Sequence, residues 1–307
     1  MLSSKEKSEF FGIEIKPLTQ KFTCYFIKEP KLIGGDNKII RLHDKVYPIF
    51  ELGDFSNWIF IYKKNNSFEA KNLYIYLKKA SKGFGLKLVE PEWVEIPNYN
   101  NIKDWFEAIN DFMTKGNKKY SFILFLLDKN KNIYYQIKKY TLCKNSYISQ
   151  VVNINSMKNK PIMSICSKIL LQINAKLGGN SLILELDKNI KDLNLMIIGV
   201  DYSHIKGKKT CFAYVATINK YFTKFYNKEH IIKEEYPENL QVCFGAFIEE
   251  SIKIYYFYNK TNPKGIIIYR QGISLYQKYY LSLEIEQIDM ACKNHIILYY
   301  YILVKKK

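Results

Sequence analysis

The stretch CSKILLQINAKLGGNSLILELDKNIKDLNLMIIGVDYSH, residues 166–204, combines a polar-striped helix, a Gly-Gly stop and a strand that delivers an aspartate. Apolar residues recur at spacings of three and four up to Leu177, which indicates one buried helical face. Gly178–Gly179 then predicts the end of the helix. The run LMIIGV, residues 195–200, is apolar throughout and predicts a strand buried on both faces, with Asp201 at its end.

A second face of the same helix is polar. Lys168, Gln172 and Lys176 follow one another every four residues, so their side chains project as one row about 12 Å long. A phosphate fits along such a row. A solvated helix face gives the same spacing, because lysine is the usual surface residue of this chain. The spacing alone leaves both interpretations open.

A second apolar run with a turn after it, GIIIYRQGISLYQ, occupies residues 265–277. Between the two apolar runs, residues 211–227 alternate as a β-hairpin does, and residues 236–258 are broadly helical. Strand, hairpin, helix and strand in this order are typical of a ribonuclease H-like domain.

With INAKLGG, GVDYSH and IIIYRQG in this order, the chain resembles the PIWI branch of the Argonaute family over roughly residues 10–304. The resemblance implies an α/β fold, in which a Rossmann-like MID domain precedes a ribonuclease H-like PIWI domain lacking its C-terminal end. We expect a linker-like segment at residues 1–53, the MID domain at 54–185 and the truncated PIWI domain at 186–307. The N-terminal lobe and PAZ domain of family members have no expected counterpart.

Apolar runs and helical periodicity also alternate upstream. We expect strands at residues 57–62, 84–89 and 120–127, helices at 70–80, 102–114 and 133–142, and a last strand at 296–304. Such alternation favours a parallel sheet with helices on both sides.

The charge balance indicates a polyanionic partner. The chain has 47 lysines and arginines against 29 acidic residues, a formal net charge of +18. A membrane surface is a less suitable anionic partner, because the sequence has no run of 18 or more apolar residues and no clear basic amphipathic helix. The six cysteines form no CxxC pair and the four histidines are not clustered, so a zinc site has little support. The N-terminus lacks the pattern of a signal peptide, and we expect an intracellular protein, in the cytoplasm or the nucleus.

The resemblance implies a pocket for the 5′ phosphate of a small guide RNA, which the family builds from a tyrosine, a lysine, a glutamine and a second lysine. Tyr134 and Lys138 match in YYQIKKY, Gln150 matches in SQVV and Lys176 in NAKLGG. Tyr134 lies four residues before Lys138, so its ring would stack on the first base while the ammonium meets the phosphate. Each residue alone is an ordinary surface type, and the four in register carry the inference.

Two further positions fit the PIWI form of this pocket. Lys168 is one of them, and Gln172 stands where PIWI proteins have an amide and Argonautes proper prefer lysine. The amide implies a Mg²⁺ ion beside the 5′ phosphate, with Gln172 as a candidate ligand.

The resemblance also implies a catalytic site in which carboxylates hold two Mg²⁺ ions. Asp201 matches the first catalytic carboxylate and metal ligand. Glu235 is the match for a second carboxylate, with Glu234 and Glu238 as close rivals. Gln271 stands at the position of a family aspartate, and the fourth position is expected beyond the end of the chain.

An amide at position 271 supplies a neutral oxygen without the charge that bridges two metals, so we expect no two-metal site and no slicer activity. The nearby Glu284 and Glu286 have a spacing that does not distinguish them from glutamates on a helix surface.

Three functions remain open. The first is a PIWI-like protein of an RNA silencing pathway that holds the 5′-phosphate end of a guide RNA, pairs with a complementary RNA target and acts through silencing partner proteins. The alternative is an RNA-guided, Mg²⁺-dependent endonuclease whose present chain is an incomplete form. The third is a decayed fragment, for which an exposed sheet edge predicts poor folding.

Overall fold

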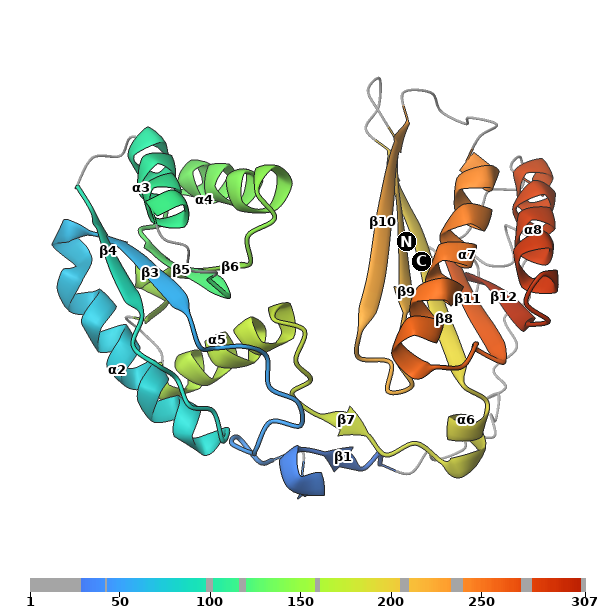
Figure 1. The fold of residues 1–307 in the computed structure, drawn as a ribbon, viewed down its shortest axis with the longest axis horizontal. Helices are drawn as coiled ribbons and strands as arrows, with labels where there is room; N and C mark the ends of the chain where they lie inside the picture. The colour runs from blue at the N-terminus through green and yellow to red at the C-terminus, as the bar shows by residue number, and fades with distance from the viewer. Residues whose placement is uncertain are drawn as a thin grey trace, which may run out of the picture. The chain divides into compact units, whose positions relative to one another are not determined.

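The structure, a computed structural model, describes residues 29–41, 43–97, 102–115, 120–157, 161–204, 210–232, 240–271 and 278–304. The chain divides into one unit at residues 1–30 and another at 31–307. The described residues of the second unit form a four-stranded, a five-stranded and a small three-stranded sheet (Figure 1).

The four-stranded sheet is parallel throughout, in the order β4-β3-β5-β6. Every residue of the two central strands, β3 and β5, is buried, as expected for largely apolar strands covered on both faces. The exception in sequence is Lys63 at the end of β3, whose ammonium pairs with Asp128 at 3.0 Å. The strands are β3 (Trp58–Lys63), β4 (Glu92–Ile96), β5 (Phe122–Leu127) and β6 (Ser149–Asn153).

Helices cover both faces of this sheet, because alternate side chains of a strand point to opposite sides. Trp58 and Phe60 of β3 join one core with α2 and α5, whereas Ile59 and Ile61 join a second core with α3 and α4. The helices are α2 (Ser67–Gly83), α3 (Ile102–Lys115), α4 (Lys131–Lys138) and α5 (Ile162–Lys176), and the 3-10 turns are η2 (Lys64–Asn66) and η4 (Ile154–Met157).

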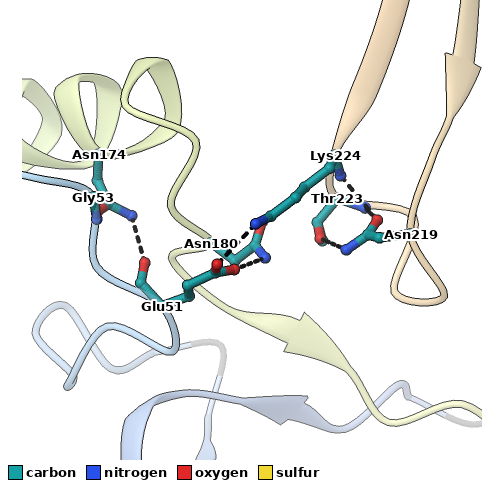
Figure 2. A network of polar contacts seen from close by, with 7 residues as sticks. All are labelled: Glu51, Gly53, Asn174, Asn180, Asn219, Thr223 and Lys224. Carbon is teal, nitrogen blue, oxygen red and sulfur yellow. Dashed lines mark hydrogen bonds and ion pairs between the residues drawn. The ribbon is translucent and has the colours of Figure 1, made fainter. Parts of the chain in front are cut away.

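The chain before β3 is attached to the end of α5. Glu51 and Asn180 exchange two backbone hydrogen bonds of 2.9 Å, and Asn174 of α5 accepts one from the Gly53 amide at 2.9 Å. The Asn174 amide nitrogen also donates to the Glu51 carbonyl oxygen at 3.2 Å (Figure 2). A Cβ atom at Gly179 would lie 2.6 Å from the Glu51 carbonyl oxygen, so this close approach needs a glycine. Gly178 has φ +81, the left-handed conformation that ends the helix.

The small sheet, of order β2-β1-β7, is antiparallel. It pairs the chain before β3 with the segment that follows α5. Its strands are β1 (Leu32–Ile33), β2 (Ile39–Ile40) and β7 (Ile183–Leu184), with the 3-10 turn η1 (Gly35–Asn37) between the first two.

The five-stranded sheet has the order β10-β9-β8-β11-β12. β8, β9 and β10 are antiparallel neighbours, and β11 lies parallel to both β8 and β12. Helices α7 and α8 pack on one face (Figure 1). The elements are α6 (Lys188–Asp192), β8 (Leu195–His204), β9 (Thr210–Thr217), β10 (Phe225–Ile232), α7 (Leu240–Asn259), β11 (Gly265–Gln271), α8 (Lys278–Lys293) and β12 (Leu298–Val304).

A buried ion pair joins β11 to α8. Arg270 Nη2 and Nε donate to the two Glu284 carboxylate oxygens at 2.9 and 3.1 Å, and the Tyr301 hydroxyl donates to Glu284 at 2.6 Å. Burial acts to lower the pKa of Arg270, but the hydrogen bonds and charge of Glu284 outweigh it and raise that pKa. The structure thus separates two glutamates that their spacing did not distinguish: Glu284 is buried beside an arginine that neutralises it, whereas Glu286 is exposed.

Three expected boundaries also differ. Residues 84–89 are not a strand: Phe84 and Leu88 are buried against the core, but this segment pairs with no strand, and β4 begins only after Pro91. The α-helix expected to reach residue 142 ends at Lys138 and continues as a π-helix over Lys139–Lys144 (η3). β8 extends past Asp201, which is paired with β9 instead of ending the strand.

Glu284→Leu is expected to lower the free energy of unfolding by about 3–5 kcal/mol, because it leaves the Arg270 guanidinium buried without its countercharge. The double variant Arg270→Met/Glu284→Leu should recover most of this loss. Urea unfolding measures both, with Glu286→Leu as the exposed control. Equal losses in the Glu284 and Glu286 variants would contradict a buried pair.

Candidate functional site

Two lysines from different helices converge on one backbone carbonyl. Lys138, the last residue of α4, donates from Nζ to the Ser149 carbonyl oxygen at 2.9 Å and to Ser149 Oγ at 2.8 Å. Lys176, the last residue of α5, donates to the same carbonyl oxygen at 2.9 Å and to Gln150 Oε1 at 2.6 Å. Ser149 and Gln150 begin β6, so the site forms where α4, α5 and β6 meet.

The two glutamines of the site have a fixed orientation. An ammonium only donates hydrogen bonds, so Gln150 must accept from Lys176 through Oε1 and donate through Nε2. Gln150 Nε2 donates to Gln172 Oε1 at 3.0 Å. The Gln172 amide nitrogen is therefore the end of this chain of hydrogen bonds. We call Lys138, Gln150, Gln172 and Lys176, with Ser149 as their common support, the lysine–glutamine cluster.

The lysine–glutamine cluster carries uncompensated positive charge. Its acceptors are neutral carbonyl, hydroxyl and amide oxygens, and within the described residues no carboxylate pairs with either ammonium. Burial and the neighbouring Lys176 ammonium lower the pKa of Lys138 to about 8. Lys176 is an exposed residue overall, yet burial of its ammonium also lowers its pKa. A bound anion would remove the repulsion between the two charges.

Two expected members of the pocket lie outside this hydrogen-bonded cluster. Tyr134 lies one turn before Lys138 on α4, is 41% exposed, and lines a neighbouring cleft of about 240 Å³ with Tyr135 and Val151. Lys168 is exposed on α5, two turns before Lys176. The structure therefore brings four of the six predicted pocket residues into one hydrogen-bonded cluster around Ser149, with Tyr134 at an adjoining cleft.

Ser149 supports the cluster although no sequence motif pointed to it. This residue is 2% exposed, and its carbonyl and hydroxyl both accept from lysine. Its Oγ also lies 3.0 Å from the Oγ1 of Thr141, which is fully buried in the π-helix. The one available signal was its place immediately before Gln150 at the start of a strand.

The predicted catalytic positions meet in a different pocket. Asp201 of β8 and Gln271, the last residue of β11, line one pocket of about 370 Å³ together with apolar residues of β9, β11 and β12. Gln271 Oε1 is buried and has no hydrogen-bond partner within the described part of the chain. Glu235, like its rivals Glu234 and Glu238, lies outside the described residues.

The chain is similar to known proteins of one family. A family model of the Piwi domain matches residues 121–307. Argonaute-3 of Drosophila melanogaster is 30% identical over 286 residues, which cover 92% of this chain and 32% of that protein. The chain belongs to the Argonaute and Piwi family. It spans about a third of the length of such curated relatives.

Solved Argonaute and Piwi structures confirm the α/β fold class. The crystal structure of Drosophila Piwi matches with a TM-score of 0.76 at 21% identity, over 90% of this chain and 39% of that one. That of Kluyveromyces polysporus Argonaute with a guide RNA matches with a TM-score of 0.73 at 16% identity, over 92% of this chain and 39% of that one. At these identities the likeness concerns the fold alone.

Among the residues that the structure describes, neither donor set fits a resident metal ion. In the lysine–glutamine cluster, the oxygens of Ser149, Gln150 and Gln172 are neutral and already accept hydrogen bonds from the lysines or from Gln150. In the other pocket, Asp201 supplies a single carboxylate beside the neutral Gln271. Within the described residues, no three acidic, histidine or cysteine side chains gather as a metal would require. Family members often use divalent metals, and such an ion here stays a prediction.

In the parts of the chain that the structure describes, no helix is both long and apolar enough to cross a bilayer.

The pKa of Lys138 makes stability depend on pH. The folded protein loses this proton at about 8, whereas the unfolded chain keeps it up to about 10.5, so unfolding takes up a proton between these values. Stability should therefore rise with pH across this window, and Lys138→Met should remove that part of the rise. Urea unfolding at several pH values measures it. The exposed Lys139→Met is the control, and an unchanged slope in Lys138→Met would contradict the assignment.

Proposed function

We propose that the protein binds the 5′-phosphate end of a small guide RNA in an RNA silencing pathway, and that it acts through binding and not through cleavage. The supporting observation is the lysine–glutamine cluster, in which two ammonium groups share one neutral oxygen. A phosphate supplies the charge that this arrangement lacks. The family membership and the guide RNA in the Kluyveromyces structure favour RNA as its carrier.

The proposed binding mode follows from the side chains. The phosphate would accept hydrogen bonds from Lys138, Lys176 and the Gln172 amide nitrogen, while Gln150 keeps that amide oriented. The first base would enter the cleft beside Tyr134, whose ring offers a stacking surface. Lys168, further along the same face of α5, would meet a later phosphate of the strand.

The proposal assigns the phosphate pocket to a MID domain at residues 54–185 and the five-stranded sheet to a PIWI domain at 186–307. A complementary RNA target and silencing proteins are the proposed partners. Cleavage is disfavoured because the described lining of the pocket of Asp201 and Gln271 combines one carboxylate with an amide at the position of a family aspartate, and an amide lacks the charge that bridges two Mg²⁺ ions. The alternative function is an RNA-guided endonuclease, and the observation that favours it is that Asp201 and Gln271 line the same pocket.

Binding of short RNAs that differ only in a 5′ phosphate or a 5′ hydroxyl tests the first part. At fixed salt the phosphate should improve affinity about tenfold or more, about 1.4 kcal/mol. Lys138→Ala and Lys176→Ala should abolish this preference, whereas Lys79→Ala on the exposed face of α2 should keep it. Fluorescence anisotropy gives the affinities. Equal binding of both RNAs by the wild-type protein would sink the proposal.

Cleavage is tested separately with a labelled target complementary to the guide in the presence of Mg²⁺. We expect no product above that formed by Asp201→Asn, because the amide at Gln271 cannot bridge two metals. Product that forms in wild type and disappears in Asp201→Asn would establish the slicer instead. Gln271→Asp is a second variant for the same cleavage assay, since it places a negative charge beside the Asp201 carboxylate.

A further inference from the structure

A surface rich in aromatic and lysine side chains lies at the end of α7 and the β9–β10 turn. Lys220 lies 5.2 Å from the centre of the Tyr221 ring, and Lys260 lies 4.9 Å from that of Phe257. The Phe257 and Tyr258 rings meet edge to face at 5.7 Å. We call these five residues the aromatic–lysine surface.

The rings of this surface are unusually open. Phe257 is 68% exposed and Tyr258 is 50% exposed, and the adjacent Tyr256 is 53% exposed. They follow one another at the end of α7, where Tyr255 still faces the core. Large aromatic groups that are exposed together mark an interaction site more often than single exposed ones do.

The surface is held in shape before any partner binds. Asn259 at the end of α7 donates from Nδ2 to the Ile218 carbonyl at 2.9 Å and accepts from the Lys220 amide at 3.3 Å. Asn219 accepts from the amides of Thr223 and Lys224, which closes the β9–β10 turn (Figure 2). A partner therefore meets a backbone that is already ordered, which lowers the conformational entropy lost on binding.

The charges complement an anion. Neither Lys220 nor Lys260 takes part in an ion pair with a described carboxylate, and Lys264 and Thr261 nearby are exposed. Lys224, whose ammonium lies 5.9 Å from the centre of the Tyr258 ring, instead pairs with Glu51 at 2.7 Å (Figure 2). The surface thus keeps two available positive charges beside stacking rings, and a carboxylate neutralises the third.

From these observations we infer that the aromatic–lysine surface binds single-stranded nucleic acid, independently of the 5′ end, by stacking bases on Phe257 and Tyr258 and pairing phosphates with Lys220 and Lys260. Every base has a face that can stack, so this binding tolerates any sequence. It adds a second contact for a strand, beyond the phosphate pocket of the proposed function. An anionic protein segment is the competing partner, and RNA is favoured because planar bases and regularly spaced phosphates match rings and lysines together.

The test uses the whole protein and a 5′-hydroxyl oligouridine, which offers the phosphate pocket no terminal phosphate. Phe257→Ala/Tyr258→Ala should weaken binding about tenfold or more, whereas Phe257→Tyr/Tyr258→Phe, which keeps both rings, should bind like wild type. Lys220→Ala/Lys260→Ala should reduce the slope of log affinity against log salt by about 1.4. Lys71→Ala/Lys79→Ala, with the same charge change on the exposed face of α2, should leave the slope unchanged.

The outcomes separate this inference from the proposed function. Loss of oligouridine binding in the ring variant with unchanged thermal stability, while Lys138→Ala still binds the oligomer, supports a second surface. Wild-type affinity in the ring variant overturns the inference and leaves the rings to a protein partner. Equal salt slopes in the two lysine pairs overturn it as well, because the charge would then act from anywhere on the molecule.

Discussion

Two ammonium groups share a single carbonyl oxygen, that of Ser149, and the local structure is arranged around this contact. It requires the last residues of α4 and α5 to reach the first residues of β6. The packing that brings them there is apolar: α4 is fixed by Ile133 and Ile137 in one core, and α5 by Ile169 and Ile173 in the core on the other face. The hydrophobic layers thus hold together two charges that would otherwise separate.

Long periodic segments such as α5, β8 and β11 were predictable from their apolar patterns, whereas the lysine–glutamine cluster came from family resemblance, because its residues lie on three elements. Two of the differences share one physical cause, which is that burial depends on partners distant in the chain. Phe84 and Leu88 fill the core beside α2 although their backbone pairs with no sheet, and the burial of Glu284 depends on Arg270. Ser149 acts through its backbone oxygen, which every residue has, so no pattern of side chains identifies it.

The five-stranded sheet has different chemistry at its two ends. The pocket end offers the Asp201 carboxylate and the amide oxygen of Gln271, for which the described residues supply no hydrogen bond, and both groups are hydrogen-bond acceptors. The end at the β9–β10 turn offers lysines and rings, which suit an anionic, planar partner. On the proposed assignments, an amide in place of an acid at Gln271 would weaken metal chemistry at one end, while the other end would keep its capacity to hold a strand.

Helix α5 is constrained on two faces at once. Gln172 and Lys176 belong to the lysine–glutamine cluster, while Asn174 between them is fully buried and bonds to the Gly53 amide and the Glu51 carbonyl. One residue inserted into or deleted from a helix turns everything beyond it by about 100°. Such a change before Gln172 would misplace both sets of contacts together. Helix α5 should therefore tolerate substitutions far better than insertions or deletions.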